Sequence, residues 1–332
     1  MSKVFDKVKT SQVNGDHSKL FVDEALIHEG APGPYVYLTD FGHQLTGLQQ
    51  PTPADEAVSN LKVHSQDKTV KETFRQVTLL ANLGVELADP YFGILYSAAF
   101  TLGYVPVFKA AVADLEHDIT LIAPLRGGKI VQVIANALGL SGEDKPINQV
   151  VEVRASRVVL KNGNYLIGVF EPEKQAVINS QVLFGDDCRA AGGSEHTLIL
   201  WCQHQNPKIK RVVSAVGMGV KRTSRELLDH WQNSQVSYLS HVGEVTNSMN
   251  KDYYLNTTAD ERRQKNLPES CVYTVSDMGS AMSLSGERGQ MIIPVVEAVA
   301  KGEISADQVL SSLAGVTKEN FKNRALTLLA NF

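Results

Sequence analysis

Two adjacent acids followed closely by two glycines are the feature of this sequence most able to do chemistry. Asp186 and Asp187 come after the apolar run 181–184, which is typical of a buried strand, and 192–194 reads Gly-Gly-Ser before a helix-like segment. Glycines let backbone N–H groups approach an anion, and a serine cap at the positive end of a helix favours phosphate. The carboxylates can accept hydrogen bonds from vicinal hydroxyls. The segment can hold a phosphorylated sugar, or it is an acidic loop that only caps a helix.

A second glycine turn lies earlier in the chain. Residues 125–128, Leu-Arg-Gly-Gly, follow the apolar run 118–123 and open the helix-like segment 129–138. Glycines permit unusual backbone geometry, and amides at a helix start favour anions. The Arg126 guanidinium adds a donor fork that suits phosphate oxygens. This pattern indicates a second anion-binding turn, with a tight structural turn as the alternative.

The elements that would position these turns alternate along the chain. Apolar residues at three- and four-residue steps predict a helix over 69–87. From residue 118 onwards short apolar strands alternate with helices, which indicates an α/β fold with a mostly parallel sheet flanked by helices. In such a sheet, ligands bind at the carboxyl edge of the strands. The other expected elements are strands at 35–38, 118–123, 150–160, 164–171, 181–184, 209–216 and 236–240, and helices at 129–138, 194–203, 223–231, 294–300, 305–313 and 318–329.

Two smaller patterns lie within these elements. Strands 150–160 and 164–171 are expected to form an antiparallel hairpin arm, because Asn162-Gly163 is a favoured hairpin turn. Gly217 and Gly219 partly match a dinucleotide-binding motif, but its third glycine is absent. A strand-to-helix turn is the simpler interpretation of that pair.

Composition excludes several classes of protein. The 332 residues are 43% hydrophobic and carry a formal net charge of −4, so nucleic acid is not expected as the main partner. A cytoplasmic location is expected, because the three cysteines show no disulfide-pairing pattern and the polar N-terminus has no signal-peptide core. No run of roughly 18 uninterrupted apolar residues is evident, so no membrane span is predicted.

The whole segment 182–194 resembles the phosphoribosyl-pyrophosphate motif of type I phosphoribosyltransferases. That motif has four apolar residues, two acids, an apolar pair, a small residue and then Thr-Gly-Gly-Thr or a close variant; here Ala191 stands where the family usually has threonine. The turn at 125–128 matches the family's pyrophosphate loop in position. The order of elements is most similar to that of uracil phosphoribosyltransferases, whose flexible β-arm would correspond to 154–170. The loop at 275–281 lies where that family recognises its base.

The resemblance implies a reaction in which a base nitrogen displaces pyrophosphate from phosphoribosyl pyrophosphate, with Mg²⁺ bound through the ligand or water beside Asp186 and Asp187. It implies a phosphoribosyltransferase-like domain at 61–290, an N-terminal extension at 1–60 packed on it, a C-terminal helical extension at 291–332, and a homodimer. The implied catalytic residues are Asp186, Asp187 and Arg126. The implied substrate-binding residues are Leu125, Gly127, Gly128, Arg154, Arg157, Ala190, Ala191, Gly192, Gly193, Ser194, Asp277, Met278 and Gly279.

Three functions remain open from the sequence. The first is a uracil-type enzyme of pyrimidine salvage. The second is an enzyme of the same fold with a different acceptor, because only Asp277 and Gly279 match the base loop and about 20 extra residues precede it. The third is a non-catalytic protein that binds phosphoribosyl pyrophosphate or nucleotides as a regulator, to which Ala191 lends support.

Overall fold

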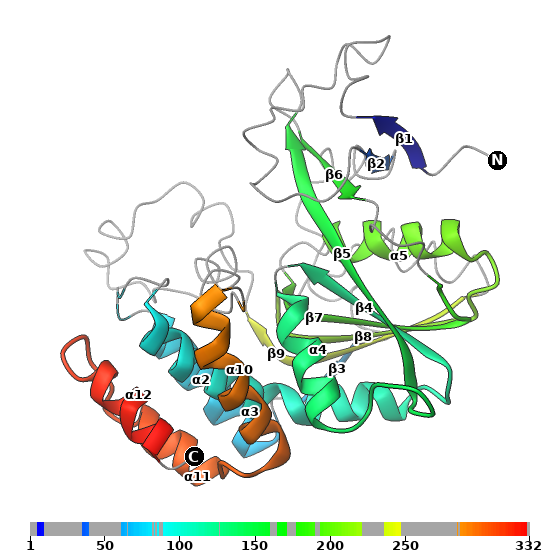
Figure 1. The fold of residues 1–332 in the computed structure, drawn as a ribbon. Coiled ribbons are helices and arrows are strands. Elements are labelled where there is room, and N and C mark those ends of the chain that lie inside the picture. Colours follow the sequence, from blue (N-terminus) through cyan, green and yellow to red (C-terminus); the bar gives the residue numbers. More distant parts are fainter. Residues whose placement is uncertain are drawn as a thin grey trace.

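The computed structural model describes residues 5–9, 35–39, 61–64, 66–81, 83, 85, 89–125, 127–159, 165–170, 177–189, 193–220, 236–246, 284 and 286–330. Within these residues nine strands form one sheet in the order β1-β2-β6-β5-β4-β7-β8-β9-β3 (Figure 1). The strands are β1 (Phe5–Lys9), β2 (Tyr35–Thr39), β3 (Leu61–Val63), β4 (Ile119–Leu125), β5 (Ile147–Val159), β6 (Tyr165–Phe170), β7 (Gln181–Arg189), β8 (Arg211–Val220) and β9 (Ser237–Thr246).

The sheet is parallel over six neighbouring strands and antiparallel at one end. β5, β4, β7, β8, β9 and β3 pair in parallel, whereas β6, β2 and β1 continue the sheet in antiparallel pairs. β5 and β6 form the expected hairpin arm, with Val159 opposite Tyr165 at its tip. β2 of the N-terminal region pairs with β6. The predicted α/β class with a mostly parallel sheet and a hairpin arm is therefore confirmed.

Helices cover both faces of the parallel part, because its strands are apolar on both sides. Leu183 and Val213 pack with one hydrophobic cluster, which includes residues of α3 (Pro90–Ala113) and α4 (Gly128–Ala137). Their neighbours Val182 and Val212 point the other way, into a cluster with α5 (Gly193–Gln205). This alternation along each strand is expected where successive side chains point to opposite faces.

The central helix of the core, α3, was not predicted from the sequence. It has no polar face, since almost all of its side chains between Phe92 and Val112 are buried or half-buried. A helix that is apolar all round gives no periodic signal, and it belongs inside a core or a membrane. α3 is long and apolar enough to span a membrane, but 78% of its most apolar window is buried inside the protein. Ser97 and Thr101 interrupt its apolar residues, so it is not an uninterrupted apolar run of roughly 18 residues.

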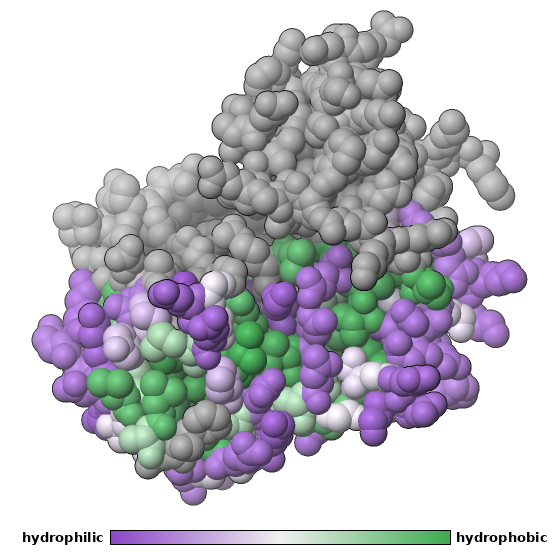
Figure 2. Space-filling model, in the orientation of Figure 1, coloured by the Kyte–Doolittle hydropathy of each residue, from purple (hydrophilic) through white to green (hydrophobic). Residues whose placement is uncertain are grey.

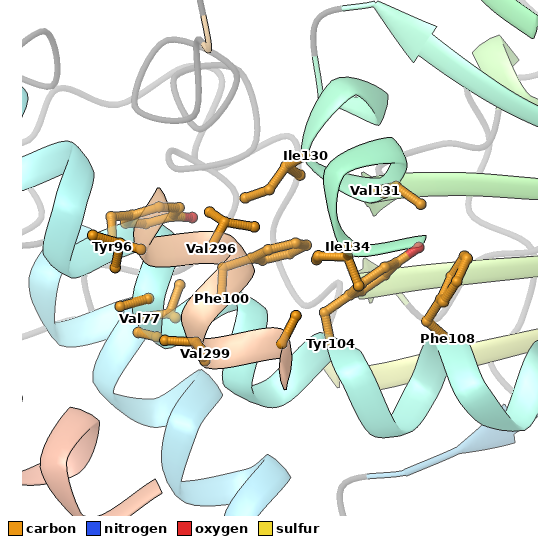
Figure 3. Close-up of a cluster of buried hydrophobic side chains, with 14 of the residues drawn as sticks. Val77, Tyr96, Phe100, Tyr104, Phe108, Ile130, Val131, Ile134, Val296 and Val299 are labelled. Carbon is orange, nitrogen blue, oxygen red and sulfur yellow. The ribbon is translucent and has the colours of Figure 1, made fainter. Parts of the chain in front are cut away.

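Aromatic side chains of α3 join the helices around it. Phe100 and Tyr104 stack with ring centroids 5.0 Å apart, and Phe108 continues the row at 5.9 Å from Tyr104. Figure 3 shows these rings facing α4, while Tyr96 lies on the side of α2 (Lys68–Ala81) and α10 (Gly286–Lys301). α3 therefore connects the sheet with a group of helices beside it.

The other described helices largely follow the predictions, with shifted ends, and the predicted helix 223–231 lies outside the described residues. α2 ends at Ala81 instead of 87, and Leu83 N–H then donates to Leu80 in a tight turn. α10 begins at Gly286, earlier than the expected 294, so it runs across residue 290, where the predicted central domain ends. α11 (Ala306–Leu313) and α12 (Phe321–Ala330) follow as expected and pack on α3. Figure 2 shows apolar residues gathered over these C-terminal helices and along the junction of α10 with α4. The three-part division of the chain and the dimer remain predictions.

Candidate functional site

The two predicted anion-binding turns follow strands β4 and β7, which are neighbours in the sheet. Numbered along the chain, β4, β5, β7, β8 and β9 have the spatial order 2-1-3-4-5. In this order the chain leaves β4 towards one edge of the sheet and returns on its other side, so the topological switch point lies between β4 and β7. Ligands of open α/β sheets bind at this point, beyond the carboxyl ends of the strands.

β4 and β7 part before either strand ends. Their shared ladder stops at Ile122 opposite Phe184. β4 continues with β5 to Leu125, and β7 continues with β8 to Arg189. The residues beyond the last shared pair are therefore no longer hydrogen-bonded to each other, and Gly127, Asp186 and Asp187 all lie in this region.

Gly127 lies directly against the two acids. A Cβ atom at this position would be 2.4 Å from Asp187 Oδ1 and 3.0 Å from Asp186 Oδ1. Its backbone is helical, with φ −59° and ψ −39°, so glycine is required here by lack of space and not by its dihedral angles. The following Gly128 packs on the end of β4, where a Cβ atom would lie 2.5 Å from the carbonyl carbon of Ala123. The structure thus brings the two predicted turns into contact.

The acids themselves lie inside β7, whereas the sequence placed them in the turn after it. Asp186 pairs with Val216 of β8, and the strand continues to Arg189. Asp187 is 5% exposed, and its backbone N–H donates to Asp186 Oδ1 at 2.9 Å. Pairing with β8 explains the difference, because it holds the acids in extended backbone.

Burial perturbs both carboxyl groups. It raises the pKa of Asp186 well above its ordinary value, and the neighbouring charge of Asp187 adds to the effect. Burial also raises the pKa of Asp187, against hydrogen bonds with Asp186 and Cys188 that lower it. A pair of this kind favours a bound cation or hydroxyl donors, because either would relieve the buried negative charge.

α3 supplies the floor beneath the acids. A Cβ atom at Gly217 of β8 would lie 2.5 Å from Phe100 Cε2 and 2.7 Å from the backbone oxygen of Asp187. Tyr104 donates its hydroxyl to the Ala215 carbonyl at 2.8 Å, and burial together with Asp186 and Asp187 raises its pKa well above the ordinary value. Tyr104 is therefore a permanent donor under the site.

The sequence missed these two aromatic residues, although a signal for them exists. Gly185 and Gly217 lie within strands, where a glycine often marks the close approach of another group. At Gly185 a Cβ atom would lie 2.6 Å from Val131 Cγ1. Gly217 and Gly219 lie within β8, so the predicted strand-to-helix turn at this pair was wrong.

Several predicted site residues cannot be placed in the site. Arg126, Ala190, Ala191, Gly192 and the loop residues Asp277, Met278 and Gly279 lie outside the described residues. Arg154 and Arg157 lie in β5, opposite Phe170 and Ile167 of the hairpin arm. α5 begins at Gly193, so Ser194 lies in its first turn and not at the cap that the sequence suggested.

The described residues hold no group of three or more histidine, cysteine or acidic side chains that could bind a metal ion by themselves. Asp186 and Asp187 nevertheless offer hard carboxylate oxygens, and their buried charge fits a cation whose other ligands come from a substrate or from water.

A second titratable cluster lies away from the predicted site residues. His64 Nε2 lies 2.9 Å from His241 Nδ1, and His241 Nε2 contacts Asp114 Oδ2. Lys62 Nζ lies 2.9 Å from the same carboxylate oxygen. Burial lowers the pKa of both histidines, with Lys62 lowering that of His64 further.

No protein-family model matches the chain, and no curated protein matches it. Solved structures with similar arrangements include the AQ2163 protein from Aquifex aeolicus, with 11% identity over 63% of this chain and 100% of that chain, at a TM-score of 0.38. Adenine phosphoribosyltransferase from Rhodothermus marinus is 17% identical over 42% of this chain and 78% of that chain, at 0.27. Mycobacterium tuberculosis orotate phosphoribosyltransferase is 14% identical over 55% and 94%, at 0.28. Likenesses this low carry no argument about function.

Proposed function

We propose that this protein transfers the phosphoribosyl group of phosphoribosyl pyrophosphate to a nitrogenous base, and that the base is uracil. The observation that carries the proposal is the contact between the two predicted turns. Gly127, at the start of α4, meets Asp187 of β7 at the topological switch point, where a sugar and its leaving group would lie side by side. The motif resemblance of 182–194 supplies the identity of the donor.

The reaction needs positioning and charge more than proton transfer. A base nitrogen forms a bond to the anomeric carbon while the bond to pyrophosphate breaks, pyrophosphate leaves with the electron pair, and the proton that the nitrogen carried is released to solvent. Asp186 and Asp187 would accept hydrogen bonds from the ribose 2- and 3-hydroxyls, and their negative charge would stabilise the cationic sugar of the transition state. Gly127, Gly128 and the helix start that they open would bind pyrophosphate.

The other parts of the site are proposed on the same basis. Bound Mg²⁺ would supply charge neutralisation to the pyrophosphate and hydroxyl oxygens, beside Asp186 and Asp187. Amides of 190–194 would hold the 5-phosphate, and Arg126 would bind the leaving pyrophosphate. The hairpin arm with Arg154 and Arg157 would exclude water from the donor, and 277–279 would contact the acceptor.

Pyrophosphate release tests this function. Purified protein with Mg²⁺ and phosphoribosyl pyrophosphate is assayed against uracil, other free bases and no base. Uracil-dependent release is expected, and Asp187→Asn should lower the rate by about 100-fold, because it removes preorganised charge next to the reacting sugar. Asp307→Asn, an exposed acid on α11, is the matched control and should retain full activity.

The other outcomes identify the alternatives. Release with a different base and not with uracil would show another acceptor, in line with the extra residues before the 275–281 loop. Tight donor binding without release for any acceptor would identify a regulator. Failure of the wild-type protein to bind phosphoribosyl pyrophosphate would refute the proposal.

A further inference from the structure

A buried ion pair joins the two ends of the proposed 5-phosphate loop. Arg189 is the last residue of β7, and Glu195 lies in the first turn of α5, so residues 190–194 connect them. Arg189 Nε contacts Glu195 Oε2, and a second guanidinium nitrogen, Nη2, donates to Oε1 at 2.5 Å. The two side chains are only 4% and 3% exposed. Because this contact is bidentate, it fixes both distance and orientation between the strand end and the helix start.

Neighbouring strands hold the same guanidinium in place. Nη2 of Arg189 also lies within hydrogen-bond distance of Ser214 Oγ (2.9 Å) in β8 and of Ser240 Oγ (2.8 Å) in β9. Tyr238 of β9 lies 3.1 Å from this nitrogen and donates its hydroxyl to Glu195 at 2.5 Å. The pair is therefore tied to the sheet, and α5 cannot move relative to β7 without breaking this network.

The charges of the pair also bear on the loop. Burial lowers the pKa of Arg189, but Glu195 and the other nearby groups outweigh it and the net shift is upward, so the guanidinium stays charged. Glu195 would by itself place a buried negative charge in the first turn of α5, beside the amides proposed to bind phosphate. Arg189 neutralises that charge at close range.

Stability alone does not account for such a pair. Replacing a buried ion pair by apolar side chains of similar volume is often neutral or stabilising, whereas removing one partner is strongly destabilising. A second role is therefore needed to explain why a guanidinium and a carboxylate lie inside this part of the fold.

We propose that Arg189 is a positioning residue, which through Glu195 sets the span of the 190–194 loop and so its fit to the 5-phosphate of the donor. This inference rests on the proposed function. Neither side chain is proposed to touch the reacting atoms. The pair determines how far the start of α5 lies from the acids on β7, and a ribose 5-phosphate must span that gap.

Calorimetry with two partial ligands tests the role. Ribose 5-phosphate probes the loop, whereas inorganic pyrophosphate with Mg²⁺ probes the turn at Gly127 and Gly128. Arg189→Met combined with Glu195→Leu replaces the pair by apolar side chains that should fold. It is expected to weaken ribose 5-phosphate binding at least tenfold and to leave pyrophosphate binding unchanged. Arg75→Met, which removes an exposed ion pair with Glu72 on α2, should change neither.

A conservative variant separates geometry from charge, and it can be measured even if the double variant does not fold. Arg189→Lys keeps the charge but cannot make the bidentate contact, so it should also weaken ribose 5-phosphate binding without affecting pyrophosphate. Wild-type affinity for ribose 5-phosphate in either folded variant would overturn the positioning role. Equal weakening of both ligands would show a merely structural role and would overturn it as well. If the wild-type protein binds neither ligand, the proposed function fails instead.

Discussion

The contact between Gly127 and Asp187 can be measured without any ligand, by a double-mutant cycle on stability. In the wild-type background, Gly127→Ala places a methyl group 2.4 Å from Asp187 Oδ1 and 2.7 Å from Asp187 Cγ. In an Asp187→Ala background both of these atoms are gone, and the nearest contact that remains is Asp186 Oδ1 at 3.0 Å. The same substitution is therefore expected to have different effects in the two backgrounds.

The magnitude follows from two opposing effects. Alanine adopts the helical dihedral angles of Gly127 freely, so restricting the unfolded chain should stabilise the protein by about 0.4–1 kcal/mol. In the wild-type background the carboxylate must also move by about 1 Å to reach ordinary contact, and overpacking of this kind costs about 1–3 kcal/mol. Gly127→Ala should therefore destabilise the wild-type protein by about 1–2 kcal/mol. It should be neutral or slightly stabilising in the Asp187→Ala background.

Urea unfolding of the four proteins, followed by circular dichroism, gives the free energies of unfolding. The expected coupling energy between the two positions is about 1–3 kcal/mol, which lies within the range of about 0.5–3 kcal/mol for residues in direct contact. Equal effects of Gly127→Ala in both backgrounds would refute the reasoning. In that case the two turns would not meet, and the proposed donor site would lose its main structural support.

Two further predictions concern the ionisable groups. Asp186→Asn should raise the free energy of unfolding at pH 7 by about 0.5–2 kcal/mol, because the raised pKa of Asp186 means that its ionised form destabilises the fold as pH rises above 3.8. Urea midpoints measure this gain, and the control Asp307→Asn should show none. A lower midpoint for Asp186→Asn than for the wild-type protein would contradict the prediction. The lowered pKa values of His64 and His241 mean that the unfolded chain binds protons first, so stability should be complete above pH 6.5 and fall as pH drops through that value. Thermal melts between pH 5 and 8 measure this loss of stability. His241→Gln should reduce the loss, whereas His117→Gln, an exposed control, should not. An unchanged pH dependence in His241→Gln would exclude His241 as its source.

The alternation of strands and helices could be predicted because it depends on local patterns. β4 and β7 are short apolar runs bounded by glycine turns, and each begins near its predicted start. The hairpin of β5 and β6 could be predicted because the sequence has Asn-Gly, a favoured turn dipeptide, between two strand-like runs. These signals lie within a few residues of one another, so no knowledge of tertiary contacts was needed.

What could not be predicted depends on contacts between distant segments. α3 gives no amphipathic signal, because helices and strands surround it on every side. The length of β7 is set by its pairing with β8, which carries Asp186 and Asp187 into extended backbone beyond the predicted end of the strand. The pairing of Arg189 with Glu195 could not be predicted either, since neither a period of two nor one of 3.6 relates two residues on different elements across an intervening loop.

The buried charges at the end of β7 are themselves an argument for ligand binding. A carboxyl group whose pKa is raised by burial destabilises the protein at neutral pH, and Asp186 and Asp187 do so side by side. Among the described residues Arg189 forms a direct ion pair with Glu195, whereas neither Asp186 nor Asp187 has one. A ligand that brings a cation and two hydroxyl donors would remove this penalty on binding, so part of its affinity would come from compensating the buried negative charge. An acidic turn that only capped α5 would not explain why Asp187 is buried against Gly127 with Asp186 beside it.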